Sequence, residues 1–171
     1  MEPDPGLSDL GLVQAQAVAR RLMALPNAER PTAVISSPLR RCRKTAAPLA
    51  EALGVSVLID PSVGEIPTPA GLSVEQRPGW LQSALAGRWA DIRGDLDYGQ
   101  WRADVIAGVA ARPGAAVFSH FVAINALVSQ LLGRDDVLVF RPNHCSVTVV
   151  KQGERGLELV SRGEEAATGV L

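Results

Sequence analysis

The stretch AVISSPLRRCRKTA, residues 33–46, decides the fold class of this chain. The apolar run Thr32–Ile35 has the length of a short strand, and apolar residues at helical spacing follow soon after it. Ser37 and Pro38 suit the N-cap and the first position of a helix. We therefore predict a strand that leads directly into a helix, the unit from which α/β domains are built.

The same alternation continues on both sides of this stretch. The predicted helix ends at Gly54, and Pro48 predicts a kink or a break within it. Apolar spacing predicts further helices between Ser8 and Pro26, within 72–111 and over 124–133, and further strands at 55–59, 115–119, 137–140, 146–151 and 157–161. We predict a three-layer α/β fold, in which helices cover both faces of a mostly parallel sheet.

The composition predicts one domain and gives no support for several kinds of partner. The chain has 171 residues, which suits a single domain over 1–171, and 47% of them are hydrophobic. A net charge of −1 gives no electrostatic reason to expect nucleic acid or a membrane surface. The longest apolar stretches, such as 105–111, are too short to span a bilayer, and residues 1–9 do not form a signal peptide. Cys42 and Cys145 form neither a metal-binding spacing nor a disulfide framework, so we expect a reducing cytoplasm. We also expect no cofactor.

Polar residues follow three of the predicted strands, at the edge where open α/β sheets bind their ligands. After the first of these strands, Arg41 lies in the first turns of a helix, where unpaired N–H groups and the helix dipole favour an anion. A guanidinium adds a planar fork of donors that matches phosphate oxygens. The alternative is a solvated basic helix face. We expect Arg40, Arg43 and Lys44 to be solvated in either case.

His120 follows another of these strands, and Glu65 lies in the loop after a third. A histidine in that position can donate to an anion or transfer a proton near neutral pH, but it can equally be a buried and satisfied side chain. A carboxylic acid near a phosphate can protonate a leaving oxygen, although Glu65 by itself is an ordinary loop glutamate. We expect His144 at the surface and the three tryptophans in the core.

Other catalytic motifs are absent from the sequence. It contains no G-x-S-x-G elbow, no G-x-x-x-x-G-K-[ST] loop, no G-x-G-x-x-G after a strand and no H-E-x-x-H. The two histidines and two unclustered cysteines offer little to a zinc ion, so we expect no metal site. The chemistry that the sequence favours is a phosphoryl site built around Arg41 and His120.

Together these segments resemble the histidine phosphatase family, which has the phosphoglycerate mutase-like fold. SSPLRRCRKTA (36–46) resembles the S-x-L-x-R-A-x-x-T-A motif of that family, and VFSHFVAINAL (117–127) resembles the segment that carries its second active-site histidine. The resemblance implies a phosphate-binding role for Arg41, and both phosphate-binding and catalytic roles for His120. VGEI around Glu65 resembles the region of the proton donor, which implies a catalytic role for this carboxyl group.

The sequence departs from this family at its beginning. The family starts with a strand that ends in Arg-His-Gly, and this histidine is the nucleophile that accepts the phosphoryl group. No Arg-His-Gly occurs in the chain, and GLSDLGLVQAQAVARRL (6–22), which resembles the family's first helix, follows Met1 almost at once. By resemblance, the missing strand lies centrally in the sheet, between the strands that end at Ser36 and Ser119. Its loss is expected to leave two strand edges unpaired.

Two hypotheses follow from this departure. The first is a phosphatase that acts on a small phosphorylated substrate through a phosphohistidine, with its start codon misassigned or its front end trimmed, so that the nucleophile is absent from this chain. The second is a catalytically inactive protein that binds a phosphorylated ligand, inorganic phosphate or a partner through the same pocket. A purely structural or interaction role comes third. The resemblance implies that substrate specificity lies largely in the variable segment 66–105, which names no ligand.

Overall fold

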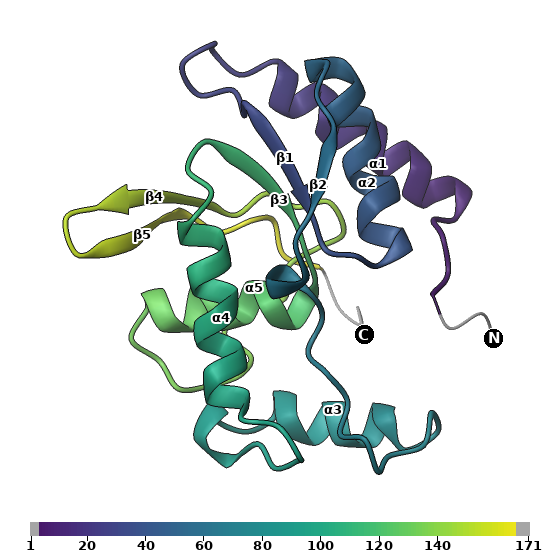
Figure 1. The fold of residues 1–171 in the computed structure, drawn as a ribbon, viewed down its shortest axis with the longest axis vertical. Coiled ribbons are helices and arrows are strands. Elements are labelled where there is room, and N and C mark those ends of the chain that lie inside the picture. Colours follow the sequence, from purple (N-terminus) through teal and green to yellow (C-terminus); the bar gives the residue numbers. More distant parts are fainter. Residues whose placement is uncertain (1–3, 167–171) are drawn as a thin grey trace.

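A small parallel sheet lies at the centre of the computed structural model, which describes residues 4–166 (Figure 1). Its strands, in the order β2-β1-β3, are β1 (Ala33–Ser36), β2 (Val57–Ile59) and β3 (Ala115–Phe118). Both pairings are parallel, and Ile35 of β1 lies opposite Leu58 of β2 and Val117 of β3. The predicted parallel α/β architecture is confirmed.

Helices flank this sheet on both sides (Figure 1). On one side are α1 (Asp9–Met23) and α2 (Arg40–Leu53), and on the other are α4 (Tyr98–Ala110) and α5 (Phe121–Leu131). Between β2 and α4 the chain forms η1 (Pro61–Val63), α3 (Arg77–Leu85) and η2 (Trp89–Asp91). An antiparallel hairpin of β4 (Val149–Gly153) and β5 (Gly156–Ser161) forms a second sheet, as the sequence predicts for this region.

Local sequence signals explain where the first two helices begin and end. The Ser8 hydroxyl accepts the backbone N–H of Gly11 at 3.2 Å and so caps α1, as predicted. Gly54 ends α2 with a φ of 68°, a left-handed conformation that costs glycine little. The helix continues through Pro48 without the predicted break. Leu49 beside it is fully buried, and this burial opposes the loss of one helical hydrogen bond.

Two apolar clusters hold the layers together. The first joins α1 and α2 to β1 and consists of Val18, Ala19, Leu22, Val34, Ala46, Leu49 and Ala50. The second joins α3, α4 and α5 below the sheet and consists of Ile66, Leu85, Trp89, Tyr98, Val122, Ala126 and Val137. Trp80 and Trp101 pack against this second cluster, so the tryptophans belong to the core as expected. Among the described residues, no helix is long and apolar enough to cross a membrane.

The prediction that a strand is missing between β1 and β3 is wrong. β1 and β3 pair directly along their whole lengths, and the N–H of Ser37 donates to the carbonyl of Phe118 at 3.0 Å just beyond the ladder. Two parallel strands satisfy each other's backbone groups at this boundary, and Val34 and Ile35 are almost completely buried there. The edges of the described three-stranded sheet are therefore β2 and the outer side of β3.

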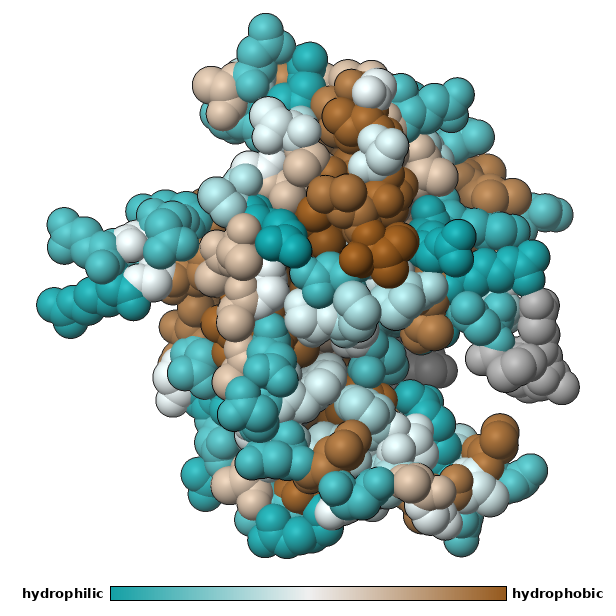
Figure 2. All heavy atoms as spheres, viewed as in Figure 1, coloured by the Kyte–Doolittle hydropathy of each residue, from teal (hydrophilic) through white to brown (hydrophobic). Residues whose placement is uncertain are grey.

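The outer edge of the sheet at β2 is poorly covered. Figure 2 shows an apolar patch over this strand. Leu58 is 55% exposed and Ile59 is 47% exposed, although successive residues of a strand point to opposite faces. β2 is thus open on both faces as well as along its unpaired edge.

Two further local predictions are wrong. The helix α2 begins at Arg40 rather than at Pro38, and the Asp4 carboxylate accepts the Arg40 N–H at 2.9 and 3.1 Å. Residues 137–140 form no strand, because a side chain takes the place of a strand partner. The Asn125 amide oxygen accepts the N–H groups of Val139 at 2.9 Å and Phe140 at 3.2 Å.

The hydrogen bonds that the Asn125 side chain accepts predict the effect of a substitution on stability. We expect Asn125→Ala to lower the free energy of unfolding by about 1–3 kcal/mol, because it removes the partner of backbone N–H groups that are shielded from water. Urea unfolding followed by circular dichroism measures the change. Asn27→Ala, at an exposed turn, is the control and should change little. Equal stabilities of the Asn125→Ala variant and the native chain would contradict the role given to this side chain.

Candidate functional site

The site residues predicted from the sequence come together where β1 and β3 end. Arg41 lies on the first turn of α2, His120 lies between β3 and α5, and Glu65 lies in the loop after η1. The Nη2 atom of Arg41 is 3.1 Å from Nδ1 of His120. The Oε2 atom of Glu65 is 3.9 Å from Nη2 of Arg41 and 3.8 Å from Nδ1 of His120. Three segments that are distant in sequence thus form one cluster of a guanidinium, an imidazole and a carboxyl group.

Hydrogen bonds fix the tautomer of His120. A guanidinium can only donate, so Nδ1 of His120 accepts from Arg41 and carries no proton. Nε2 therefore carries the proton and donates it to the Ser37 hydroxyl oxygen, 2.7 Å away. That oxygen also accepts the N–H of Leu39 at 3.3 Å. The imidazole is held at both of its nitrogens as a neutral ring.

The electrostatic surroundings keep His120 neutral. Burial lowers the pKa of His120 to about 4, and the adjacent Arg41 guanidinium adds to this effect. Burial also raises the pKa of Glu65, against the opposing effects of the Ile66 N–H, which Oε1 accepts at 2.9 Å, and of Arg41. A carboxyl group whose pKa is raised retains its proton to a higher pH, which suits a general acid.

Cys42 lies against the imidazole but does not have the character of a reactive thiol. Its Sγ is 3.5 Å from Nε2 of His120 and 3.2 Å from the carbonyl oxygen of Ser119. Burial raises the pKa of the Cys42 thiol to about 12, so the nucleophilic thiolate is rare at neutral pH. Cys42 acts here as a small buried side chain, as the sequence predicts.

Exposure distinguishes Arg41 from the other basic residues of α2. Arg40, Arg43 and Lys44 are exposed on α2, as expected for a solvated face, whereas the Arg41 side chain is only 37% exposed and turns toward His120. His144 is exposed, as predicted.

Sequence reasoning missed two residues of the site. Ser37 was predicted to cap a helix, but its hydroxyl accepts from His120 and it is fully buried. Its place in the S-x-L-x-R stretch was the signal available in the sequence. Asp4 was not singled out at all. Its carboxylate binds the N–H of Arg40 at the beginning of α2, and no sequence pattern pairs residues so far apart.

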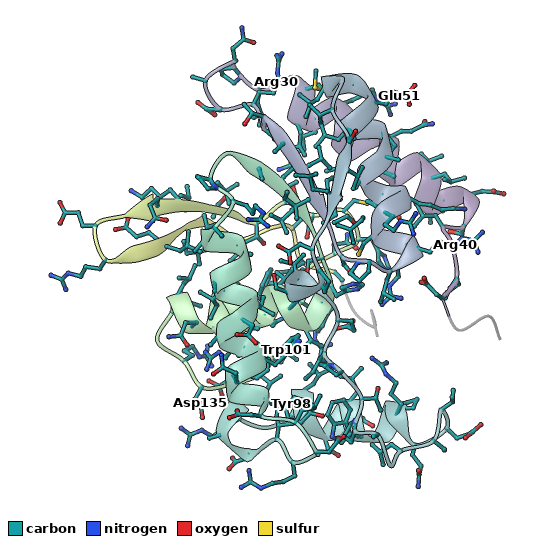
Figure 3. The ribbon with its side chains drawn as sticks, viewed as in Figure 1. Arg30, Arg40, Glu51, Tyr98, Trp101 and Asp135 are labelled. Atoms are coloured by element: carbon teal, nitrogen blue, oxygen red, sulfur yellow. The ribbon has the colours of Figure 1, made fainter. Side chains whose placement is uncertain are left out.

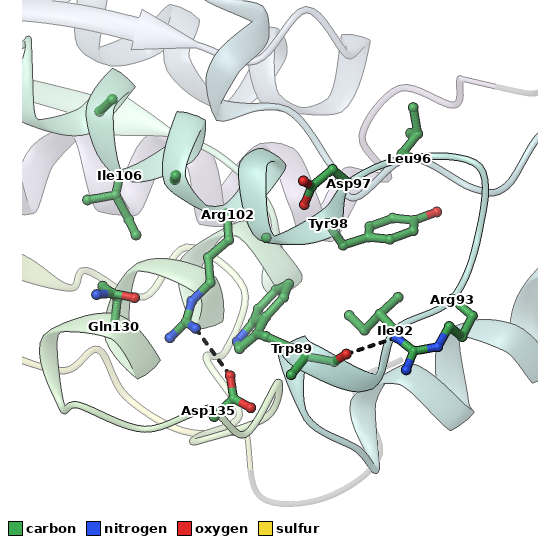
Figure 4. A pocket seen from close by; sticks show the side chains of 14 residues that line it. Trp89, Ile92, Arg93, Leu96, Asp97, Tyr98, Arg102, Ile106, Gln130 and Asp135 are labelled. Atoms are coloured by element: carbon green, nitrogen blue, oxygen red, sulfur yellow. Dashed lines mark hydrogen bonds and ion pairs between the residues drawn. The ribbon is translucent and has the colours of Figure 1, made fainter.

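A cavity elsewhere in the molecule does not contain these residues. Figure 4 shows this space of about 710 Å³ between η2 and α4, with Trp89, Arg102 and Asp135 in its wall. In Figure 3, Tyr98, Trp101 and Asp135 lie in the lower part of the molecule, well away from Arg40 at the beginning of α2. The Arg102 guanidinium already donates to the Ser129 hydroxyl at 3.0 Å and lies 5.2 Å from the centre of the Trp89 ring. We interpret this wall as structural.

The comparisons with known proteins agree with the predicted family. A sequence model of the histidine phosphatase superfamily (branch 1) matches residues 1–165. The chain therefore belongs to the histidine phosphatase superfamily. The motif around Arg41 and the segment around His120 both lie within the matched range.

Solved phosphatase structures share the fold. A mycobacterial glucosyl-3-phosphoglycerate phosphatase superposes with a TM-score of 0.70 at 23% identity, over 96% of this chain and 91% of that chain. Phosphoserine phosphatase from Entamoeba histolytica, in complex with 3-phosphoglyceric acid, superposes with a TM-score of 0.73 at 20% identity, over 95% of this chain and 86% of that chain. At these identities, the similarity establishes the architecture of this chain.

A curated relative matches a shorter region. The transcription factor tau 55 kDa subunit of Saccharomyces cerevisiae is 32% identical over 83 residues, which are 43% of this chain and 19% of that protein. The matched region thus spans about a fifth of the length of this relative.

The low pKa of His120 predicts how stability depends on pH. Because folding lowers this pKa from 6.5 to about 4, the unfolded chain binds the proton more readily between these values, and stability falls as the pH falls. We expect His120 to account for a loss of about 2 kcal/mol between about pH 7 and about pH 4.5.

Urea unfolding of the native chain and of His120→Asn over this pH range tests the prediction. The difference between the two curves isolates His120 from other titrating groups, including Glu65, whose raised pKa acts in the opposite direction. Parallel curves for the native chain and His120→Asn would show that His120 titrates alike in the folded and unfolded states.

Proposed function

We propose that this protein is a phosphatase of the histidine phosphatase type, which acts on a small phosphorylated substrate through a phosphohistidine. The present chain supplies the phosphate-binding and proton-donating parts of the site. The observation that carries the proposal is the 3.1 Å contact between Arg41 and His120 beside Glu65, in a chain that belongs to this superfamily. No metal takes part in this proposed chemistry.

Each of the three residues has a role that its chemistry supports. The Arg41 guanidinium offers two parallel donors to the oxygens of a phosphoryl group and neutralises part of their charge. His120, on the neighbouring element, donates to the phosphoryl group when its Nδ1 carries a proton. Glu65, with its raised pKa, holds a proton that the leaving oxygen of a phosphate ester requires.

The nucleophile of this reaction is not among the 171 residues, since no Arg-His-Gly occurs in them. We propose that the strand that carries it pairs with the outer edge of β3. β1 already has a partner on each side, so it has no edge left for another strand. A parallel strand beside β3 would end at the same edge of the sheet as β3, and its last residues would then lie close to His120.

Solved relatives support a phosphate ester as the substrate. The mycobacterial phosphatase forms a complex with inorganic phosphate, and the Entamoeba histolytica enzyme forms one with 3-phosphoglyceric acid. We propose a ligand of the same general chemistry for this chain. We also propose a cytoplasmic location, on the ground that Cys42 and Cys145 are both free thiols.

A second function is favoured by a specific observation. The contacts of Arg41, Ser37 and His120 are all formed without any Arg-His-Gly segment. The chain is therefore also a candidate phosphate-binding protein without catalytic activity. The two functions differ in turnover and share the binding step.

The binding step predicts the effect of losing the guanidinium. We expect inorganic phosphate to bind the chain with a saturable heat in calorimetry, and Arg41→Ala to weaken this binding about 10- to 100-fold, the value of one or two charge-assisted hydrogen bonds. Arg43→Ala, which removes an exposed arginine from the same helix, is the matched control and should bind like the native chain. If the Arg41→Ala variant binds phosphate as tightly as the native chain, the proposed site is wrong.

The coding DNA separates catalysis from simple binding. We expect the DNA upstream of Met1 to encode, in frame, a strand that ends in Arg-His-Gly. A protein with this extension should hydrolyse p-nitrophenyl phosphate, and Arg41→Ala should abolish the turnover, whereas the chain of 171 residues should bind phosphate without hydrolysing it. An upstream frame without such a strand would favour the non-catalytic function.

A further inference from the structure

The Arg41–His120 contact uses the donors and acceptors that a phosphoryl group would need. One N–H of the guanidinium points at Nδ1 of His120, and Nδ1 presents a lone pair in return. An oxyanion placed beside both groups would meet a donor on Arg41 but an acceptor on His120. Two acceptors repel each other, so Nδ1 must gain a proton before it can bind the anion.

Ser37 holds the imidazole so that it does not turn its protonated nitrogen, Nε2, toward the anion. The other nitrogen, Nε2, already carries a proton, but that proton is donated to the Ser37 hydroxyl at 2.7 Å. Ser37 is fully buried and His120 is only 5% exposed, so turning the ring over would break this hydrogen bond at a buried ring nitrogen. The ring therefore keeps Nε2 toward Ser37 and offers Nδ1 to the ligand.

The charges that face His120 set the balance between its neutral and protonated forms. Titratable groups face the ring from each of the surrounding elements. They are Asp4 before α1, Arg41 and the uncharged thiol of Cys42 on α2, Glu65 after η1, and Arg77 on α3. Burial disfavours a proton on the ring most strongly, the two arginines also disfavour it, and Asp4 favours it. A bound dianion beside Arg41 adds negative charge next to the ring, which favours a proton on it.

We propose that binding of a phosphoryl oxyanion at Arg41 is coupled to the uptake of one proton at Nδ1 of His120, and that Ser37 is the positioning residue that makes this proton necessary. The proton comes from the solution, forms the N–H bond at Nδ1, and turns His120 into an imidazolium that donates to the anion. This inference rests on the proposed phosphate site. It goes further by stating the protonation state in which the anion is bound.

Calorimetry in two buffers measures the coupling directly. Sulfate is the probe, because it is a tetrahedral dianion that does not titrate near neutral pH, so any proton taken up belongs to the protein. We expect the observed binding heat at pH 7.5 to vary with the ionisation heat of the buffer with a slope that corresponds to about one proton. The affinity should fall about tenfold for each unit rise in pH.

Variants of Ser37 distinguish positioning from a merely structural role. In Ser37→Ala the ring is free to turn Nε2–H toward the anion, so sulfate should still bind while the proton uptake falls toward zero. Ser37→Thr retains the hydroxyl and should restore the uptake. The ¹⁵N shifts of His120 in the unaltered chain provide a measurement that needs no variant, and they should show a single neutral tautomer protonated at Nε2 before sulfate is added and an imidazolium afterwards.

The possible failures are distinguishable. Saturable sulfate binding with no dependence on the buffer would overturn the coupling and leave the proposed phosphate site intact. Absence of binding of both sulfate and phosphate would overturn the proposed function itself. A Ser37→Ala chain that folds and still takes up a full proton would remove Ser37 from the mechanism.

Discussion

The direct parallel pairing of β1 with β3 is the constraint on which the rest of this structure depends. Parallel strands in register end at the same edge of a sheet, so the residues that follow Ser36 and Phe118 must meet there. Ser37 directly follows Ser36, His120 follows Phe118 by two positions, and the two side chains are joined by a 2.7 Å hydrogen bond. The helix α2 begins a few residues later and brings Arg41 to the other side of the same imidazole.

Burial determines what this cluster can do chemically. In water, a histidine titrates near neutral pH and a glutamate is ionised there. Here the loss of hydration favours the neutral form of both His120 and Glu65, and the guanidinium of Arg41 supplies the positive charge. A fixed cation next to neutral groups that can be protonated is well suited to an anionic ligand whose own charge shifts these equilibria. The function that we propose uses these same groups.

The part of the molecule formed by α3, α4 and α5 serves stability more than chemistry. The helices α3, α4 and α5 enclose Trp89, and the wall of the large cavity beside it is tied together by Arg102 (Figure 4). The edges of the three-stranded sheet are β2 and the outer side of β3. The two edges differ in their position relative to the site. β3 leads to His120, whereas β2 lies beyond β1 and exposes Leu58 and Ile59.

The sequence by itself determined the alternation of strands and helices, the parallel α/β architecture and the superfamily, and it predicted Arg41, His120 and Glu65 as the site residues. Periodicity, caps such as Ser8 and Gly54, and a short motif carry this information locally. Only the tertiary structure decided that β1 and β3 are neighbours, that Ser37 binds His120 rather than capping α2, and that 137–140 is held by Asn125 rather than by a strand. The physical reason is that strand order and buried hydrogen bonds depend on partners distant in the chain, which local spacing does not specify.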